Sequence, residues 1–143
     1  ELVYYGANVS MGYALSGEDL CKGDERLGRL ATGDLARVDE DGIYTIVGRK
    51  KRFLKIFGKR TNLQEVEHIL RQKFGITELA CAGRDDKLYV FLAEKQHADE
   101  IIPYLKEKLS LHPSAFAVKV IAAIPKNAAG KTIYRELEQY YDC

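Results

Sequence analysis

The stretch GRKKRFLKIFGKRTNLQEVE, residues 48–67, is where the character of the chain changes. It opens with a basic segment, residues 49–60, that has seven lysines and arginines in twelve positions. A helix pattern follows, because Asn62 is a favourable N-cap, apolar side chains recur on one face as far as Phe74, and Gly75 is a typical helix end. The stretch therefore predicts a domain boundary close to its start and a helix at its end.

The chain after this stretch has the pattern of a compact α+β unit. Residues 78–83 and 87–94 are apolar runs that predict a pair of strands, and residues 117–124 predict a further strand. A second helix is expected to start between Asp99 and Pro103, with the proline in its first turn, and to run to Leu109. The order predicts a small α+β domain with a central few-stranded sheet flanked by helices, ending in a short terminal helix.

The chain before this stretch reads as strands and turns. Asp41-Gly42 lies between two runs of strand-forming residues, and glycine accepts the positive φ of a tight turn, so we predict a β-hairpin there. No helix is expected in residues 1–48. The predicted division is a β-hairpin-rich segment, residues 1–49, followed by the α+β unit, residues 50–143.

The composition excludes several classes of protein. The chain has 143 residues, 46% hydrophobic and 30% charged, and its net charge of +1 gives no global argument for nucleic acid or membrane binding. It has no apolar run long enough to cross a bilayer and no secretion signal at its start, so a cytoplasmic protein is expected. It begins without Met, which suggests a piece of a longer chain. Three distant cysteines, Cys21, Cys81 and Cys143, predict no disulfide framework, and no residue spacing predicts a metal site.

The sequence AAGKT, residues 128–132, looks like the end of a phosphate-binding P-loop. That loop needs a glycine five residues before its Gly-Lys-Thr, where its backbone amides face phosphate, and this chain has Pro125 there, which has no amide proton. A turn into the terminal helix, with Gly130 at the bend and Thr132 as N-cap, is the alternative. It leaves the lysine at the apex of the turn unexplained.

The basic segment raises the hypothesis of nucleic-acid binding, because clustered cations are the electrostatic mark of such proteins. Phe53 and Phe57 lie among the basic residues together with aliphatic side chains, so part of the segment must pack instead of facing solvent. This favours a structural or enzymatic role over nucleic-acid binding.

Three stretches in order resemble the C-terminal part of the adenylate-forming superfamily, which includes acyl-CoA synthetases, peptide-synthetase adenylation domains and firefly luciferase. They are residues 32–53, with the motif TGD, residues 55–67, and residues 124–132, which contain the Gly-Lys pair. Ala129 departs from the Ser or Thr that the family usually has before this pair. The positions that match the central family motif are Gly48, Arg49, Lys55, Gly58, Arg60, Glu65 and Glu67.

The resemblance implies roles for individual residues. Asp34 would accept hydrogen bonds from the ribose hydroxyls of ATP, and Arg49 would reach the nucleotide from the domain boundary. Lys51 would be the hinge about which a mobile C-terminal domain turns. Gly58 would leave room for the acceptor arm, and Arg60 would meet phosphate charge. In the terminal loop, Lys131 would be the catalytic lysine that stabilises the negative charge of adenylation.

The function implied by the resemblance is that of an ATP-dependent acyl-CoA synthetase, which activates a carboxylic acid as an acyl-adenylate and transfers the acyl group to a thiol. Residues 1–49 would be the end of a large domain and residues 50–143 the mobile domain. The cofactors would be ATP, Mg²⁺ held mainly by the rest of the large domain, and coenzyme A; residues 1–143 alone would be inactive. Two alternatives stay open: a carrier-protein phosphopantetheine arm as acceptor, or a non-catalytic interaction domain.

Overall fold

The computed structural model describes residues 1–141, which form two compact units, Glu1–Lys51 and Arg52–Cys143. The division falls two residues after the predicted boundary of 49/50. Lys50 belongs with the first unit because its amide donates a hydrogen bond to the carbonyl oxygen of Gly33, at 2.7 Å. The assignment of the units to a large and a mobile small domain stays a prediction.

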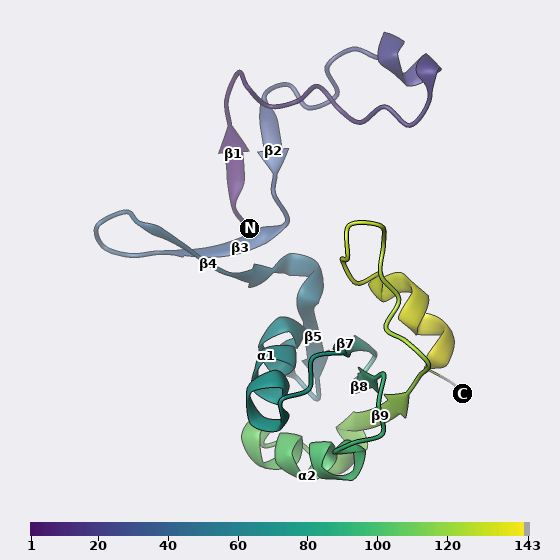
Figure 1. Ribbon diagram of the computed structural model, residues 1–143. Helices are drawn as coiled ribbons and strands as arrows, with labels where there is room; N and C mark the ends of the chain where they lie inside the picture. The colour runs from purple at the N-terminus through teal and green to yellow at the C-terminus, as the bar shows by residue number, and fades with distance from the viewer. Residues whose placement is uncertain (142–143) are drawn as a thin grey trace. The chain divides into compact units, whose positions relative to one another are not determined.

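The first unit consists of two antiparallel strand pairs (Figure 1). β1 (Val3–Tyr5) pairs with β2 (Arg29–Ala31), and β3 (Asp34–Val38) pairs with β4 (Tyr44–Arg49). The turn between β3 and β4 contains the predicted Asp41-Gly42, with Gly42 at a φ of 80°. The expectation of no helix was wrong for Gly17–Cys21, a five-residue 3₁₀ helix whose N-cap Ser16 and Asp19 form a capping box.

The second unit is the predicted α+β domain. The connection into it is a 3₁₀ turn, η2 (Lys50–Arg52). Its elements are β5 (Phe53–Ile56), β6 (Lys59–Asn62), α1 (Leu63–Phe74), β7 (Leu79–Arg84), β8 (Lys87–Leu92), α2 (Ala98–Leu109), η3 (Pro113–Ala115), β9 (Phe116–Val120) and η4 (Tyr134–Tyr140). β5 and β6 form a hairpin, and the other strands form a sheet in the order β7-β8-β9.

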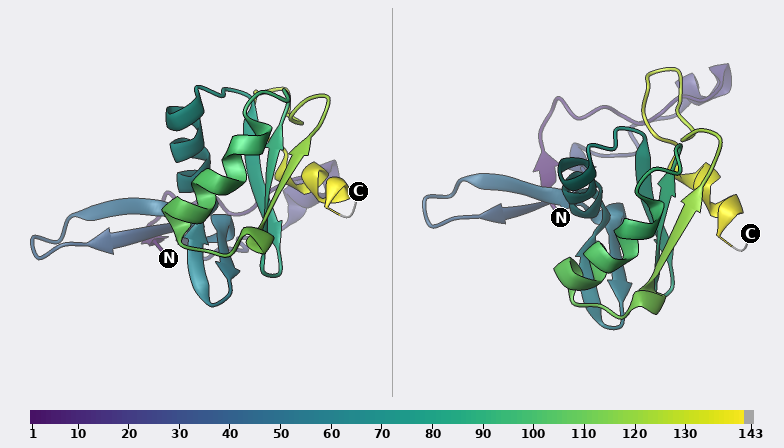
Figure 2. Two further views of the ribbon diagram at one scale, coloured as in Figure 1. Left: turned by 90° about the horizontal axis from the view of Figure 1, so that it is seen from below. Right: turned by 60° about the horizontal axis from the view of Figure 1, so that its bottom comes forward.

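The three-stranded sheet carries a core on each face. β7 and β8 are antiparallel, whereas β8 and β9 are parallel because α2 connects them. Alternate residues point to opposite faces: Cys81 and Val90 face α1 and α2, while Ala80 and Phe91 face η4. Figure 2 shows α1 and α2 on one side of this sheet and η4 on the other. Both faces of the sheet are therefore covered within this unit.

The predicted first helix has the predicted ends. The side chain of Asn62 accepts a hydrogen bond from the amide of Gln64, at 3.0 Å. Gly75 follows the last turn in the left-handed conformation, with a φ of 68°. Leu63, Val66 and Leu70 are buried on one face, as the helical spacing predicts.

Two helix predictions need correction. α2 begins at Ala98, so Pro103 lies inside the helix and not in its first turn. Burial of Ile101 and Leu105 on the same face holds this helix together across the proline, which removes one backbone hydrogen bond. The terminal helix is a 3₁₀ helix that begins at Tyr134 with Ile133 as N-cap, so Thr132 is not the cap.

None of the helices within residues 1–141 is long and apolar enough to cross a bilayer. Cys21 and Cys81 are both free thiols, the first exposed and the second buried. Cys143, the third cysteine of the sequence, lies outside the described residues.

Candidate functional site

Asp34 and Arg49, two predicted nucleotide-binding residues, form an ion pair in the first unit. They are partners in the β3–β4 register, and Arg49 Nε lies 3.0 Å from Asp34 Oδ1. The Asp34 side chain is 25% exposed and that of Arg49 65% exposed. Both charged groups are thus open to solvent and to a ligand that offers hydroxyl groups to the carboxylate.

The backbone around Asp34 is fixed by its TGD neighbours. Thr32 Oγ1 donates to the carbonyl oxygen of Leu2 and accepts from the amide of Asp34, at 2.8 and 3.1 Å. Gly33 has a φ of 76°, which L side chains rarely adopt. These bonds hold the Asp34 carboxylate at the start of β3.

Lys131 lies near the tip of an ordered loop between β9 and η4. The loop is closed by a bridge between Lys126 and Thr132 and by a hydrogen bond from the amide of Ile133 to the carbonyl oxygen of Pro125, at 2.8 Å. Gly130 has a φ of 73° and supplies the bend, as predicted. We call residues 125–133 the lysine loop. Within residues 1–141 the structure gives the exposed Lys131 side chain no hydrogen bond or ion pair.

Asn127 organises the lysine loop from inside. Its Oδ1 accepts from the amides of Ala129 and Lys131, at 3.0 and 2.9 Å, and its backbone bonds to both Gly130 and Lys131. An asparagine that satisfies amides two and four residues ahead is a common way to hold a turn without regular structure. The backbone of Lys131 is therefore fixed while its ammonium group stays free of protein partners among the described residues.

Gly58 and Arg60 lie in the β5–β6 hairpin, a different element from the lysine loop. The hairpin has a two-residue turn, and both turn residues have positive φ, 47° for Phe57 and 84° for Gly58, as in type I′ turns. A Cβ on Gly58 would meet no atom within 4 Å. The Arg60 guanidinium carbon lies 4.1 Å from the centre of the Phe53 ring. The hairpin thus presents an open glycine and an exposed, stacked arginine.

The comparisons with known proteins agree on one superfamily. No protein-family model matches the chain. It is 29% identical to the 2-succinylbenzoate–CoA ligase of Bacillus cytotoxicus, over 97% of this chain and 30% of that enzyme. It is 30% identical to the long-chain-fatty-acid–CoA ligase of Salmonella typhimurium, over 96% of this chain and 26% of that enzyme.

A solved structure with the same fold is that of the o-succinylbenzoate CoA synthetase MenE from Bacillus subtilis, in complex with the acyl-adenylate intermediate. Its TM-score is 0.56 at 27% identity, over 78% of this chain and 24% of that chain. The chain corresponds to the C-terminal part of an adenylate-forming enzyme. It spans about a third or less of the length of the curated relatives named above.

The local structure around Lys131 also bears on the P-loop alternative, because a P-loop opens an α-helix directly. In this chain η4 begins only at Tyr134, and it is a 3₁₀ helix. The P-loop alternative is therefore excluded by the local structure as well as by Pro125.

Lys51, the proposed hinge of the adenylate-forming enzyme, lies in η2 at the end of the first unit. Its side chain is exposed. The next residue, Arg52, is buried and belongs to the second unit. The boundary between the two units therefore lies directly after the proposed hinge residue.

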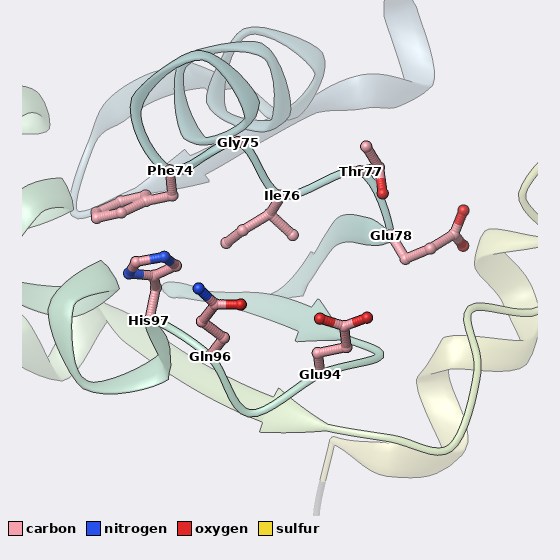
Figure 3. A pocket seen from close by; sticks show the side chains of 8 residues that line it. All are labelled: Phe74, Gly75, Ile76, Thr77, Glu78, Glu94, Gln96 and His97. Atoms are coloured by element: carbon pink, nitrogen blue, oxygen red, sulfur yellow. The ribbon is translucent and has the colours of Figure 1, made fainter.

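A pocket lies between the end of α1 and the start of α2, and none of the predicted site residues lines it (Figure 3). The rings of Phe74 and His97 pack against each other at one end of it, tilted by 34° with centres 5.3 Å apart, and Glu78 and Glu94 lie at the other. Glu78 also pairs with Lys126, whose Nζ is 2.7 Å from both carboxylate oxygens, and this pair ties the base of the lysine loop to the α1–β7 connection.

Sequence reasoning missed two features of this site. Asn127 was not recognised as the residue that holds the lysine loop, although an Asx-turn position two residues before Ala129 was a usable signal. Glu67 was recognised only as a position of the central family motif, and its burial was not predicted. It lies on the apolar face of α1 between Leu63 and Leu70 and is buried. A charged residue at a helical position that should be apolar was the signal for a buried polar contact.

Proposed function

We propose that the chain is the C-terminal part of an AMP-forming acid–thiol ligase that uses ATP and coenzyme A, with Lys131 as the catalytic lysine of the adenylation step. The observation that carries the proposal is the Lys131 ammonium group, held on a fixed backbone yet exposed and, within the described chain, without a partner. Similarity to two CoA ligases over nearly the whole chain supports the acid–thiol class.

In the first step a carboxylate oxygen of the acid bonds to the α-phosphorus of ATP, and the bond from this phosphorus to the bridging oxygen of pyrophosphate breaks. Negative charge accumulates on the oxygens around the phosphorus as two anions approach. An ammonium group fixed beside them stabilises that charge without reorganisation, which is the main contribution of enzymes to such transfers. Lys131 is suited to this role because its loop is ordered before the nucleotide arrives.

Asp34 and Arg49 are proposed to hold the nucleotide. The two Asp34 oxygens suit the vicinal hydroxyls of a ribose, and the planar Arg49 guanidinium suits ribose or phosphate oxygens. Arg49 Nε lies 3.0 Å from Oδ1 of Asp34, and we propose that the other carboxylate oxygen accepts from a ribose hydroxyl. The acyl-adenylate bound in MenE, a relative of similar fold, supports a nucleotide ligand for this class of chain.

In the second step the thiol loses its proton, its sulfur bonds to the acyl carbon, the bond from that carbon to the AMP oxygen breaks, and AMP leaves. We propose that the second unit turns about Lys51 between the steps, so that Lys131 leaves and the β5–β6 hairpin approaches the acceptor. A Cβ added to Gly58 would meet no atom within 4 Å, so there is space for a pantetheine arm beside Arg60.

Mg²⁺ would accompany ATP, but the described residues do not form a site for it. In residues 1–141 no group of three or more histidine, cysteine, aspartate or glutamate side chains could hold a metal ion. We therefore attribute no step of this chain to a metal. When bound, Mg²⁺ would neutralise phosphate charge, a contribution we assign to the remainder of the large domain.

A carrier-protein phosphopantetheine arm is the second candidate acceptor. Gly58 and Arg60 could accommodate its thiol arm as well as that of coenzyme A. A non-catalytic interaction domain is the third candidate, and the fixed backbone of the exposed Lys131 favours the catalytic role over it. We further propose a cytoplasmic enzyme whose partners are a carboxylic acid and coenzyme A. Residues 1–143 alone are expected to give no ATP–pyrophosphate exchange.

The proposal is tested by Lys131→Ala in the full-length enzyme. Loss of one preorganised charge-stabilising group should lower the adenylation rate roughly a hundredfold or more. Thioester formation from supplied acyl-adenylate should stay normal, because Lys131 is not used in that step. The matched control is Lys95→Ala, which removes another exposed lysine of the same unit. Equal loss of both half-reactions, or no loss of adenylation, would contradict the proposal.

A further inference from the structure

A buried polar cluster inside the second unit lies close to the lysine loop and has no role in the proposed chemistry. Its centre is the Glu67 carboxylate, whose side chain is 6% exposed. Arg52 Nη2 donates to Glu67 Oε1, and the amide of Cys81 donates to the same oxygen at 2.8 Å. Tyr134 Oη lies 3.3 and 3.4 Å from the two carboxylate oxygens and donates to them. We call Arg52, Glu67 and Tyr134 the Glu67 cluster.

Arg52 is held on three sides. Besides its bond to Glu67, its Nη1 donates to the carbonyl oxygen of Cys81 at 2.8 Å, and its guanidinium carbon lies 3.7 Å from the centre of the Tyr134 ring. A buried charge is tolerated only when it is paired and hydrogen-bonded in good geometry, so each of these contacts constrains the others. Burial raises the pKa of Tyr134, the Arg52 charge opposes this rise and Glu67 adds to it. The phenol therefore stays protonated and remains a donor.

The members of the cluster come from the two ends of the unit. Arg52 is its first residue and directly follows Lys51, the proposed hinge. Tyr134 is the first residue of η4, three positions after Lys131 and next to Ile133, which closes the lysine loop through Pro125. Glu67 on α1 joins these two segments. The cluster thus links the residue where the chain enters the unit to the base of the lysine loop.

We propose that Arg52, Glu67 and Tyr134 are positioning residues for Lys131, because they hold the base of the lysine loop in a fixed relation to the residue that follows the hinge. This inference rests on the proposed function, in which rotation at Lys51 delivers Lys131 to the nucleotide. A rigid connection makes the loop move with the unit as one body. Catalysis by a positioned charge is sensitive to displacements of about 1 Å, so a loosened connection slows adenylation specifically.

The variant that isolates the connection is Tyr134→Phe, since it removes only the hydroxyl and keeps the ring against Arg52. Its matched control is Tyr140→Phe, a change of the same kind in the same helix, at a ring that packs near Phe91. Glu67→Gln is the second variant and should act in the same direction more strongly, because it leaves the buried Arg52 charge unpaired.

The first measurement is amide hydrogen exchange of the 143-residue chain, which needs no activity. Tyr134→Phe should speed exchange at Asn127, Gly130 and Ile133 about threefold or more, while β8 amides, such as Val90, keep their rates. Tyr140→Phe should leave the loop unchanged. Unchanged loop exchange in Tyr134→Phe overturns the proposal. An equal rise in the loop and in β8 also overturns it, since the hydroxyl would then only support the fold.

The second measurement is the pair of half-reactions in the full-length enzyme. Tyr134→Phe should lower kcat for adenylation about tenfold, with the KM for ATP and the thioester half-reaction unchanged. Equal loss of both half-reactions overturns a positioning role. If Lys131→Ala leaves adenylation intact, the proposed function fails and the link to catalysis fails with it. The exchange data then still decide separately whether the cluster fixes the loop.

Discussion

Arg49 Nε lies 3.0 Å from Asp34 Oδ1, across the first residue pair of the β3–β4 ladder. Two residues that the sequence places fifteen positions apart, each inferred separately to reach a nucleotide, thus form one charged pair. An ion pair this exposed contributes little to stability, a median of about 0–1 kcal/mol. The pair therefore serves either the fold, to a small extent, or the nucleotide ligand proposed above.

The first prediction separates these two explanations. Asp34→Ala in the full-length enzyme should raise the KM for ATP roughly tenfold, about 1.4 kcal/mol, because the ribose hydroxyls lose their acceptor. The free energy of unfolding should change by less than about 1 kcal/mol. Arg37→Gln, on the same strand and also exposed, is the control and should change neither quantity. A normal KM for ATP in Asp34→Ala would remove the ribose role.

The second prediction concerns Asn127, which holds the lysine loop through two amides. Asn127→Ala should lower the adenylation rate roughly tenfold, because the Lys131 backbone loses the acceptor that fixes it. The thioester half-reaction should be unaffected. The neighbouring change Ala128→Ser, which leaves the Asn127 acceptor in place, is the control. Wild-type adenylation in Asn127→Ala would mean that the order of the loop does not matter for catalysis.

The third prediction concerns stability. Asn62→Ala removes the acceptor that caps α1 and should lower the free energy of unfolding of the second unit by about 1 kcal/mol. Gln64→Ala keeps the capped amide and should cost much less. Urea unfolding followed by circular dichroism measures both. Equal effects of the two changes would show that the cap hydrogen bond is not the source of the stabilisation.

Local signals explain which parts of the fold were predictable. α1 has both of its ends marked in sequence, Asn62 at the start and Gly75 after the last turn, and the β3–β4 turn has its Asp41-Gly42 pair. In each case one residue has a side chain or a φ that suits only that position. The α+β class of the second unit could be inferred because apolar strand patterns and helical patterns alternate along the sequence. The observed sheet confirms this class.

The remainder depends on contacts between distant residues. α2 starts before Pro103 because burial of Ile101 and Leu105 outweighs the local cost of the proline. In the sequence Arg52 is one of seven cations in a basic segment. In the structure it is buried against Glu67, fifteen residues away, and Glu67 in turn contacts Tyr134, a further sixty-seven residues along. No periodicity reveals such a partner. The roles of Lys131, Asp34 and Lys51 came from the order of family motifs, and they remain predictions.

The fourth prediction concerns Gly58 in the β5–β6 turn. Gly58→Leu should leave pyrophosphate exchange normal and strongly reduce thioester formation, because the new side chain enters the open space proposed for the pantetheine arm. A φ of 84° strains residues with a Cβ, so Gly58→Ala is the control, because alanine shares the strain but adds only a methyl group. If Gly58→Leu blocks adenylation as well, the hairpin is not specific to the second step.

The fifth prediction uses Arg60 to identify the acceptor. Coenzyme A carries a nucleotide with several phosphate charges, whereas a carrier-bound arm has only one phosphodiester, so an arginine can contribute more to binding free coenzyme A. Arg60→Ala should raise the KM for coenzyme A roughly tenfold, about 1.4 kcal/mol, at an unchanged adenylation rate. Arg60→Lys retains the charge but loses the planar stacking on Phe53, so its KM should lie between those of the wild type and Arg60→Ala. An unchanged KM for coenzyme A in Arg60→Ala, together with weaker transfer to a carrier protein, would favour the carrier-bound arm, since the arginine would then act on that partner instead.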